Sequence, residues 1–404
     1  MSVLYLDTAR LGRTCAAASQ AQLDVNRLLV DDPSLYCENL FRNGADAWPE
    51  ERLAQYPSFK TWHGLRSLQR EFAKHFSISD PENVFLASRS VQLVRIASRI
   101  MFRACRNVLT CDMNWPHWQH IVADEATRSG QRVSVAEVHS AVFDQGLTAE
   151  SLVETLAAEF LDRDCDGIFL PAVTNLGIRL PISELLSRLK PSGRLRFVLV
   201  DAAQSFCQLP EPSPTKHVDV TITGCHKWLG GGNPLGVATC GRSIVAEQFR
   251  RILESGHCPE LEDPLLRFSQ QIGGNSVSRY LETVNITPLF TVNAAIQEQR
   301  TKSKHLQEQL ERQQKNLNTL EQCVDGTPWN VLDIDESLRS GILLVQSQNP
   351  LHRESDCQSL GDRFRKHGVA FSSYPQGVIR ISTPKSLASN HATNVMEQAF
   401  QCVA

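Results

Sequence analysis

Short apolar runs alternate with longer segments of helical periodicity, and this alternation constrains the fold more than any other feature of the sequence. Between the runs, segments 64–76, 91–104 and 182–189 repeat apolar residues every three or four positions, as one face of a helix does. The alternation predicts an α/β fold with a mostly parallel sheet covered on both faces. The expected buried strands are Val84–Leu86, Val108–Leu109, Gly167–Leu170, Phe197–Val200 and Val218–Ile222.

The pattern changes after Thr287. One long helical pattern with a Gln- and Glu-rich polar side extends to about Val324, and shorter strand and helix patterns follow. We therefore expect a large α/β domain over 15–287 and a small C-terminal α+β domain over 288–404, joined by the long helix. Residues 1–14 are candidates to pack on the small domain.

Charge and composition exclude several classes of protein. The 404 residues carry 41 Lys and Arg against 44 Asp and Glu, a net charge of −3, without the basic excess of a nucleic-acid-binding protein. No apolar run approaches the roughly 18 residues that cross a bilayer, and the N-terminus lacks a signal-peptide pattern. None of the 12 cysteines forms a Cys-x-x-Cys pair, so we expect reduced thiols and no metal site. The sequence predicts a cytoplasmic protein with neither a nucleic-acid nor a membrane partner.

One acidic and one basic residue stand in unusual places. Asp201 ends a buried strand, and Lys227 follows 26 residues later between His226 and Trp228, just before the glycines at 230–232. A buried carboxylate needs a cationic partner, and partial burial makes a lysine more nucleophilic. These residues form either a structural ion pair or a reactive lysine with its partner. The glycines fit neither G-x-G-x-x-G nor a phosphate-binding P-loop, which disfavours nucleotide binding through those motifs.

The segment Asp201-Ala202-Ala203-Gln204 and the pair His226-Lys227 resemble the pyridoxal-phosphate enzymes of fold type I, in the aminotransferase class V and cysteine desulfurase family. The resemblance implies a large, mostly parallel sheet domain, a smaller C-terminal domain, pyridoxal 5′-phosphate as cofactor and a homodimer with shared active sites. It implies that Lys227 carries the cofactor, Asp201 pairs with its pyridine nitrogen, Gln204 reaches its ring hydroxyl and His226 binds its phosphate.

Two further segments resemble the cofactor-binding parts of that family. Arg89 and Ser90 follow a predicted strand where the family has a phosphate-binding turn at a helix start, and Trp115 stands where the family has its ring-stacking residue. The resemblance implies that all three contact the cofactor. The residues themselves also allow Arg89 to face solvent and Trp115 to be an ordinary core tryptophan.

Three more segments bear on the substrate and the second subunit. Asn175, in Thr174-Asn175-Leu176-Gly177, matches a residue that contacts cofactor or substrate, and Thr283 matches one that reaches the neighbouring subunit's phosphate. Arg380, in an Arg-x-Ser strand, matches the residue that binds the substrate's α-carboxylate, which suits a planar guanidinium. A surface arginine is the alternative at that position.

The absence of a cysteine from one segment narrows the set of possible reactions. Cysteine desulfurases carry a nucleophilic cysteine on a loop shortly before this arginine, whereas residues 369–377 contain none. We therefore disfavour desulfuration and expect an aminotransferase-type reaction on a small amino acid through an external aldimine, with a β-elimination (C–S) lyase or an epimerase as the alternative. His117, Tyr374 and Cys225 are candidates for a second acid or base.

Overall fold

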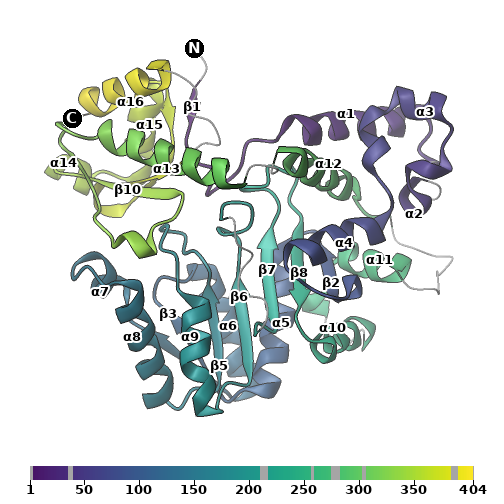
Figure 1. The fold of residues 1–404 in the computed structure, drawn as a ribbon, viewed down its shortest axis with the longest axis horizontal. Coiled ribbons are helices and arrows are strands. Elements are labelled where there is room, and N and C mark those ends of the chain that lie inside the picture. The colour runs from purple at the N-terminus through teal and green to yellow at the C-terminus, as the bar shows by residue number, and fades with distance from the viewer. Residues whose placement is uncertain are drawn as a thin grey trace.

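The computed structural model describes residues 3–34, 40–209, 217–255, 259–273, 283–302, 306–383 and 390–403. Its main element is a seven-stranded sheet with the strand order β2-β8-β7-β6-β5-β3-β4 (Figure 1). The neighbours from β7 to β4 pair in parallel, whereas β8 is antiparallel to both β7 and β2. The strands are β2 (Val84–Ala87), β3 (Asn107–Cys111), β4 (Arg132–Ala136), β5 (Gly167–Pro171), β6 (Phe197–Asp201), β7 (Val220–Gly224) and β8 (Gly236–Cys240).

This sheet confirms the expected mostly parallel α/β fold. Four of the five apolar runs fall within β2, β3, β5 and β6. The run at 218–222 forms its strand two residues later than expected, at Val220–Gly224. Asp219 precedes that strand, and its carboxylate accepts a hydrogen bond from the backbone N–H of Val198 at 2.8 Å.

Both faces of the sheet are buried, as continuous apolar strands require. Along β6, Phe197 and Leu199 pack into one cluster, while Val198 and Val200 pack into another on the opposite face. The first cluster holds helices α5 (Ser90–Ala104), α6 (Pro116–Ser129) and α10 (Ser243–Ser255). The opposite face is covered by α8 (Ala149–Asp162) and α9 (Ile182–Leu189) and, toward β2, by α4 (Leu65–His75). Further helices are α2 (Phe41–Asn43), α3 (Glu50–Gln55), α7 (His139–Phe143) and α11 (Pro264–Gly273).

The C-terminal part has its own antiparallel sheet and core (Figure 1). Its strand order is β12-β13-β10-β9, and the core gathers around Trp329, Phe364 and Phe400. The elements are β9 (Trp329–Val331), β10 (Ile342–Ser347), β12 (Ser372–Tyr374), β13 (Val378–Ser382), α13 (Leu306–Gln322), α14 (Pro350–Glu354), α15 (Cys357–Lys366) and α16 (Asn390–Cys402).

The expected long helix corresponds to two helices, α12 (Thr287–Lys302) and α13, on either side of 303–305, which lie outside the described residues. Helix α12 lies beside α1 (Ala16–Asp31) in Figure 1, and its Leu289 and Val292 share a cluster with Val25 and Leu28 of α1. These contacts join α12 to the large domain. We therefore propose that the domain boundary follows α12 and does not precede it.

The N-terminal segment runs from the small domain to the large one. Strand β1 (Leu4–Tyr5) pairs in parallel with β11 (Val369–Ala370). Further along, the N–H of Gly12 donates to the His226 carbonyl at 2.8 Å, and that of Cys15 donates to the Gly230 carbonyl at 3.0 Å. The segment therefore crosses from the small sheet to the chain that surrounds Lys227. No helix in the described ranges is long and apolar enough to span a membrane.

Candidate active site

Two neighbouring parallel strands deliver Asp201 and Lys227 to one edge of the large sheet. Asp201 is the last residue of β6 and pairs in register with Ile222 of β7. Lys227 lies on the turn that begins after Gly224, the end of β7. The carboxyl ends of parallel strands form the usual ligand-binding edge of an α/β sheet. Each of the two charges acts on the pKa of the other group, so the topology brings these predicted partners together.

The carboxylate of Asp201 is 8% exposed and held by two donors. Its Oδ2 accepts from the indole Nε1 of Trp118 at 2.8 Å, and its Oδ1 accepts from the backbone N–H of Ala203 at 2.8 Å. Burial raises its pKa, whereas Lys227 and the two hydrogen bonds act in the opposite direction. The sequence reasoning missed Trp118. This arrangement fixes the orientation of a carboxylate suited to hold a proton on a ligand.

The amine of Lys227 is buried, and burial lowers its pKa to about 8. The charge of Arg380 acts in the same direction, and that of Asp201 opposes both. The N-terminal segment passes over the backbone here: a Cβ atom on Gly12 would lie 1.8 Å from the Lys227 carbonyl oxygen, so only glycine fits. The lowered pKa raises the fraction of neutral, nucleophilic amine near physiological pH far above that of an ordinary lysine.

A second group of polar atoms lies at the start of α5, which begins at Ser90. Gly236 packs so closely beneath it that a Cβ atom there would lie 2.5 Å from the Ser90 nitrogen. The Nδ1 atom of His226 is buried and has no hydrogen-bond partner among the described residues. Burial lowers the pKa of His226 to about 4, and the charges of Lys227 and Arg89 contribute. A helix start, an exposed arginine and an unpartnered imidazole nitrogen together suit an anion.

The turn before α5 is anchored by a residue that the sequence reasoning missed. The carboxylate of Asp263, 5% exposed, accepts from the N–H and the hydroxyl of Ser88 and from the N–H of Leu266. The N–H and the hydroxyl of Ser88 therefore already have an acceptor within the protein. This leaves Ser90 and Arg89 as the predicted anion ligands on this turn.

The amide of Gln204 is largely occupied within the protein. Its Nε2 donates to the carbonyl of Ala9 at 2.8 Å, and its Oε1 accepts from the Trp228 indole at 2.9 Å. Since an amide nitrogen carries two hydrogens, one N–H is left over. Contact with the ring hydroxyl, the role predicted for Gln204, rests on that single donor.

Arg380 is a buried residue of the small sheet, 3% exposed. Its Nη1 donates to the Asn175 carbonyl at 3.0 Å, and its Nη2 donates to Oδ1 of Asp7 at 3.2 Å and to the Ser372 hydroxyl at 3.3 Å. The ring of Tyr374 lies 5.6 Å from the guanidinium. The structure thus brings Arg380 and Asn175 together, and it adds Asp7, which the sequence reasoning missed.

The remaining candidates differ in their surroundings. Trp115 caps α6 and is 45% exposed, and His117 and Thr283 are also exposed. Ring stacking by Trp115 and a contact of Thr283 with a second subunit stay predictions. Cys225 is buried in an apolar cluster, and burial raises the pKa of its thiol well above the ordinary value, so it is a poor acid or base.

The polar groups described above fit pyridoxal phosphate. A buried amine lies near a buried carboxylate, as an aldehyde-bearing pyridine ring requires. The unpartnered Nδ1 of His226, on whose pKa the charge of Arg89 acts, suits the phosphate. Among the described residues, no cluster of His, Cys, Asp and Glu could hold a metal ion.

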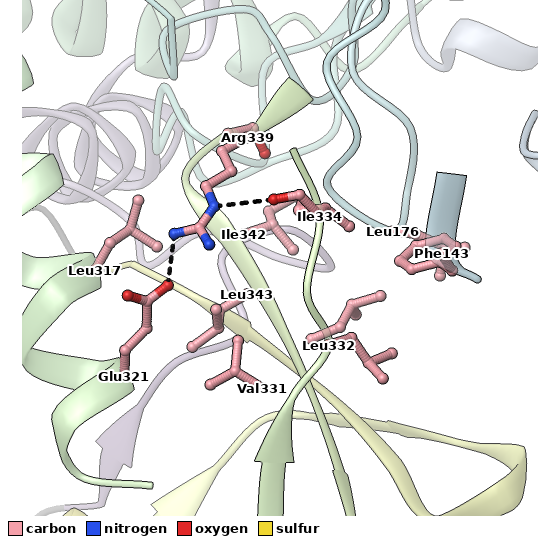
Figure 2. Close-up of a pocket in the computed structure, with 12 residues that line it drawn as sticks. Phe143, Leu176, Leu317, Glu321, Val331, Leu332, Ile334, Arg339, Ile342 and Leu343 are labelled. Atoms are coloured by element: carbon pink, nitrogen blue, oxygen red, sulfur yellow. Dashed lines mark hydrogen bonds and ion pairs between the residues drawn. The ribbon is translucent and has the colours of Figure 1, made fainter. Parts of the chain in front are cut away.

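A separate apolar pocket lies beside the small sheet (Figure 2). Two of its polar residues interact: the Arg339 guanidinium contacts Oε1 of Glu321 at 3.0 Å and also the Ile334 carbonyl at 3.4 Å. The pocket approaches the candidate site through Leu176, which follows Asn175, and through Ile342, which packs against Trp228. None of the predicted site residues lines it, so we do not assign it to the active site.

Solved structures confirm the fold. The chain superposes over 98% of its length on 93% of the cysteine desulfurase CsdA from Escherichia coli, with 13% identity and a TM-score of 0.68. It superposes over 99% of its length on 97% of a cystine C–S lyase in complex with cysteine persulfide, with 16% identity and a TM-score of 0.67. For an alanine–glyoxylate aminotransferase from Nostoc sp. the shares are 100% and 95%, with 15% identity and a TM-score of 0.67.

Sequence comparison supplies the family. No curated protein sequence matches the chain significantly. Residues 55–339, more than half of the chain, match the model of the aminotransferase class-V family. The matched region includes Asp201, Lys227 and the turn before α5. The chain therefore belongs to the aminotransferase class-V family and is a pyridoxal-phosphate-dependent transferase or lyase of fold type I.

Proposed function

We propose that the protein carries out an aminotransferase-type reaction on a small amino acid. The observation that carries this proposal is the buried pair of Lys227 and Asp201, in which the lysine has a pKa of about 8. An amine with this pKa can both attack a carbonyl and exchange a proton near neutral pH. Transamination needs such a group, and it needs no other acid or base.

Each residue has a proposed part in the reaction. Pyridoxal phosphate supplies an electron sink that stabilises negative charge at the substrate's Cα. Asp201, oriented by Trp118 and Ala203, holds the proton on the pyridine nitrogen. Lys227 Nζ takes a proton at one carbon and returns it at another. His226 holds the phosphate, together with Arg89 and Ser90 at the start of α5.

The substrate side is proposed to lie at the small domain. Arg380 and Asn175, which are hydrogen-bonded to each other, would face the α-carboxylate. We also propose a cytoplasmic homodimer in which Thr283, exposed on its own subunit, reaches the partner's phosphate. Size-exclusion chromatography with light scattering tests the dimer: a monomer at micromolar concentration would contradict it.

A β-elimination (C–S) lyase is the second candidate function. The connection from β12 to β13 consists only of Pro375–Gly377 and contains no cysteine, which disfavours a persulfide mechanism but not elimination. One similar structure is described as a cystine C–S lyase in complex with cysteine persulfide. Epimerisation would need a second acid or base, for which Tyr374 near Arg380 and the exposed His117 remain candidates.

A substrate screen separates the two functions. L-Amino acids are offered to the holoenzyme with and without α-keto-acid acceptors, and products are followed by chromatography. Turnover that requires a keto acid would support transamination. Release of ammonia, pyruvate or sulfide without an acceptor would support the lyase and contradict the aminotransferase proposal.

A further inference from the structure

The guanidinium of Arg380 has a counter-ion inside the protein. Its Nη2 lies 3.2 Å from Oδ1 of Asp7, and the two side chains are only 4% and 6% exposed, so solvent screens the pair little. The hydroxyl of Ser372 lies 2.9 Å from both oxygens of Asp7 and 3.3 Å from Nη2. Arg380, Asp7 and the part-buried Ser372 therefore form a closed group of polar contacts.

The backbone holds Asp7 in place. The carbonyl of Leu6 accepts from the N–H of Ser382 at 2.8 Å, and the N–H of Ala9 donates to the Ser382 hydroxyl at 2.9 Å. Ser382 belongs to β13, the same strand as Arg380. Since the residues on both sides of Asp7 are bonded to this strand, its carboxylate has little freedom to leave the guanidinium.

Arg380 nevertheless keeps donors for a ligand. A guanidinium has five N–H groups, and within the described residues its acceptors are Asp7, Ser372 and the Asn175 carbonyl. Its buried Nε has no partner there. Arg380 can therefore still donate hydrogen bonds to a substrate, but its positive charge is already compensated by Asp7.

We propose that Asp7 is a specificity-determining residue: by neutralising Arg380, it weakens the hold on a substrate's α-carboxylate and admits amines whose carboxylate is absent or blocked. This inference rests on the proposed function, because it takes Arg380 as the group that faces the α-carboxylate. A carboxylate that meets an already paired guanidinium gains hydrogen bonds and is repelled by the nearby Asp7. The charge of the carboxylate therefore adds little to the difference in affinity between an amino acid and the corresponding amine.

Matched ligand pairs test the proposal on the holoenzyme. L-Alanine is compared with ethylamine and L-cysteine with cysteamine, each amine being the amino acid without its carboxylate. The change in the cofactor's visible absorption gives an apparent Kd for each ligand. The measured quantity is the selectivity ratio, the Kd of the amine divided by the Kd of its amino acid.

The wild-type selectivity ratio should stay below about a hundredfold, because the carboxylate gains hydrogen bonds without an uncompensated charge. Asp7→Asn keeps the size and the acceptor oxygen of the side chain but removes the charge. It should raise the ratio by about tenfold or more, since no other carboxylate of the described residues then pairs with the guanidinium. The melting temperature of this variant should fall, because a buried cation loses its partner.

Ser372→Ala is the matched control. It removes the hydroxyl that joins Asp7 to Arg380 and leaves both charges in place. Its selectivity ratio should stay within about threefold of the wild type, since one neutral hydrogen bond is worth little. A rise as large as that of Asp7→Asn would assign the effect to loosened geometry and would overturn the role of charge.

Two results overturn the proposal directly: an unchanged or lowered ratio in Asp7→Asn, and a wild-type ratio above about a thousandfold. The second needs no variant, so a poorly folding Asp7→Asn leaves the proposal testable. Arg380→Gln distinguishes the role of Arg380 in binding the carboxylate from the role of Asp7. If it leaves the ratio unchanged, Arg380 does not face the carboxylate, and the substrate side of the proposed function fails as well. A ratio that responds to Arg380→Gln but not to Asp7→Asn refutes the role of Asp7 alone.

Discussion

The polar groups at the two ends of the candidate site differ in how completely they are hydrogen-bonded within the protein. At the edge of the large sheet, the Nδ1 of His226 is buried without a partner among the described residues. Burial of the Lys227 amine disfavours its charged form and so lowers its pKa. At the small sheet, Arg380 is already bonded to Asp7, Ser372 and Asn175. Incompletely satisfied groups mark the place where a tightly held cofactor supplies the missing partners. At the small sheet most of the polar contacts are already made, and the Nε of Arg380 is the donor left without a partner among the described residues.

The largest effect that this contrast predicts comes from Lys227→Ala. Turnover should fall by at least about a thousandfold, because the nucleophile and the proton carrier are lost together. In the wild type, borohydride treatment followed by peptide mapping should find the cofactor on Lys227. The exposed Lys190 offers a control, since Lys190→Ala should leave turnover unchanged. Attachment to another lysine would show that the cofactor edge is misassigned.

Two buried aspartates make the next test: Asp201 ends β6, and Asp219 lies just before β7. Asp201→Asn should lower kcat by about a hundredfold, because an amide cannot hold the ring nitrogen's proton. Asp219 is equally buried, but its carboxylate bonds Val198 and Arg242. Asp219→Asn should therefore lower the melting temperature with little change in kcat. Equal losses of kcat in both variants would refute a specific role for Asp201.

The sequence predicts the large sheet well, because its strands are buried on both faces and read as continuous apolar runs. It also predicts Asp201 and Lys227, since charged residues at the ends of such runs are conspicuous. It predicts a domain boundary before α12, whereas we propose one after it, because α12 residues such as Val292 share a cluster with α1. Amphipathic periodicity shows that a helix has a buried face but not which domain buries it.

The partners that the sequence reasoning missed share a physical property. Trp118 is one tryptophan in an ordinary helical pattern, and Asp7 lies 373 positions before Arg380. Asp263 reaches Ser88 across 175 positions. Each acts by a side-chain hydrogen bond between segments that only the tertiary fold brings together. No local spacing encodes such contacts, so the residues that orient a site are harder to predict than the residues that react.

The lowered pKa of Lys227 predicts a pH dependence at the cofactor edge. In the cofactor-free protein, the rate of covalent cofactor attachment should rise about tenfold per pH unit and level off near pH 8, where the amine becomes neutral. Stopped-flow absorbance measures this rate. Because the folded protein binds this proton less tightly than the unfolded chain, the free energy of unfolding should also rise from about pH 8 to pH 10.5. A rate that keeps rising to pH 10.5 would show an unperturbed lysine.

His226→Ala should weaken cofactor binding by about tenfold, since a hydrogen bond to a charged phosphate is lost. Equilibrium dialysis of pyridoxal phosphate against the cofactor-free protein measures this affinity. The control is His352→Ala. His352 is also buried, 2% exposed, but its Nδ1 bonds Ser347 in the small domain. This variant should lose stability and keep cofactor affinity. Equal weakening in both variants would mean that the effect is a general loss of stability.

The smallest effect concerns Trp118, and it tests whether orientation as well as charge matters at the cofactor edge. Trp118→Phe removes the N–H that Oδ2 of Asp201 accepts at 2.8 Å. Because this bond lowers the pKa of Asp201, its loss should raise that pKa, move the acid limb of the kcat profile to higher pH and reduce kcat about three- to tenfold. Trp228→Phe is the matched control, since the Trp228 indole makes the same kind of bond to Gln204 at 2.9 Å. Trp118 would only fill space beside the sheet if Trp118→Phe lowered kcat without moving the acid limb. The same conclusion would follow if Trp228→Phe moved the acid limb equally.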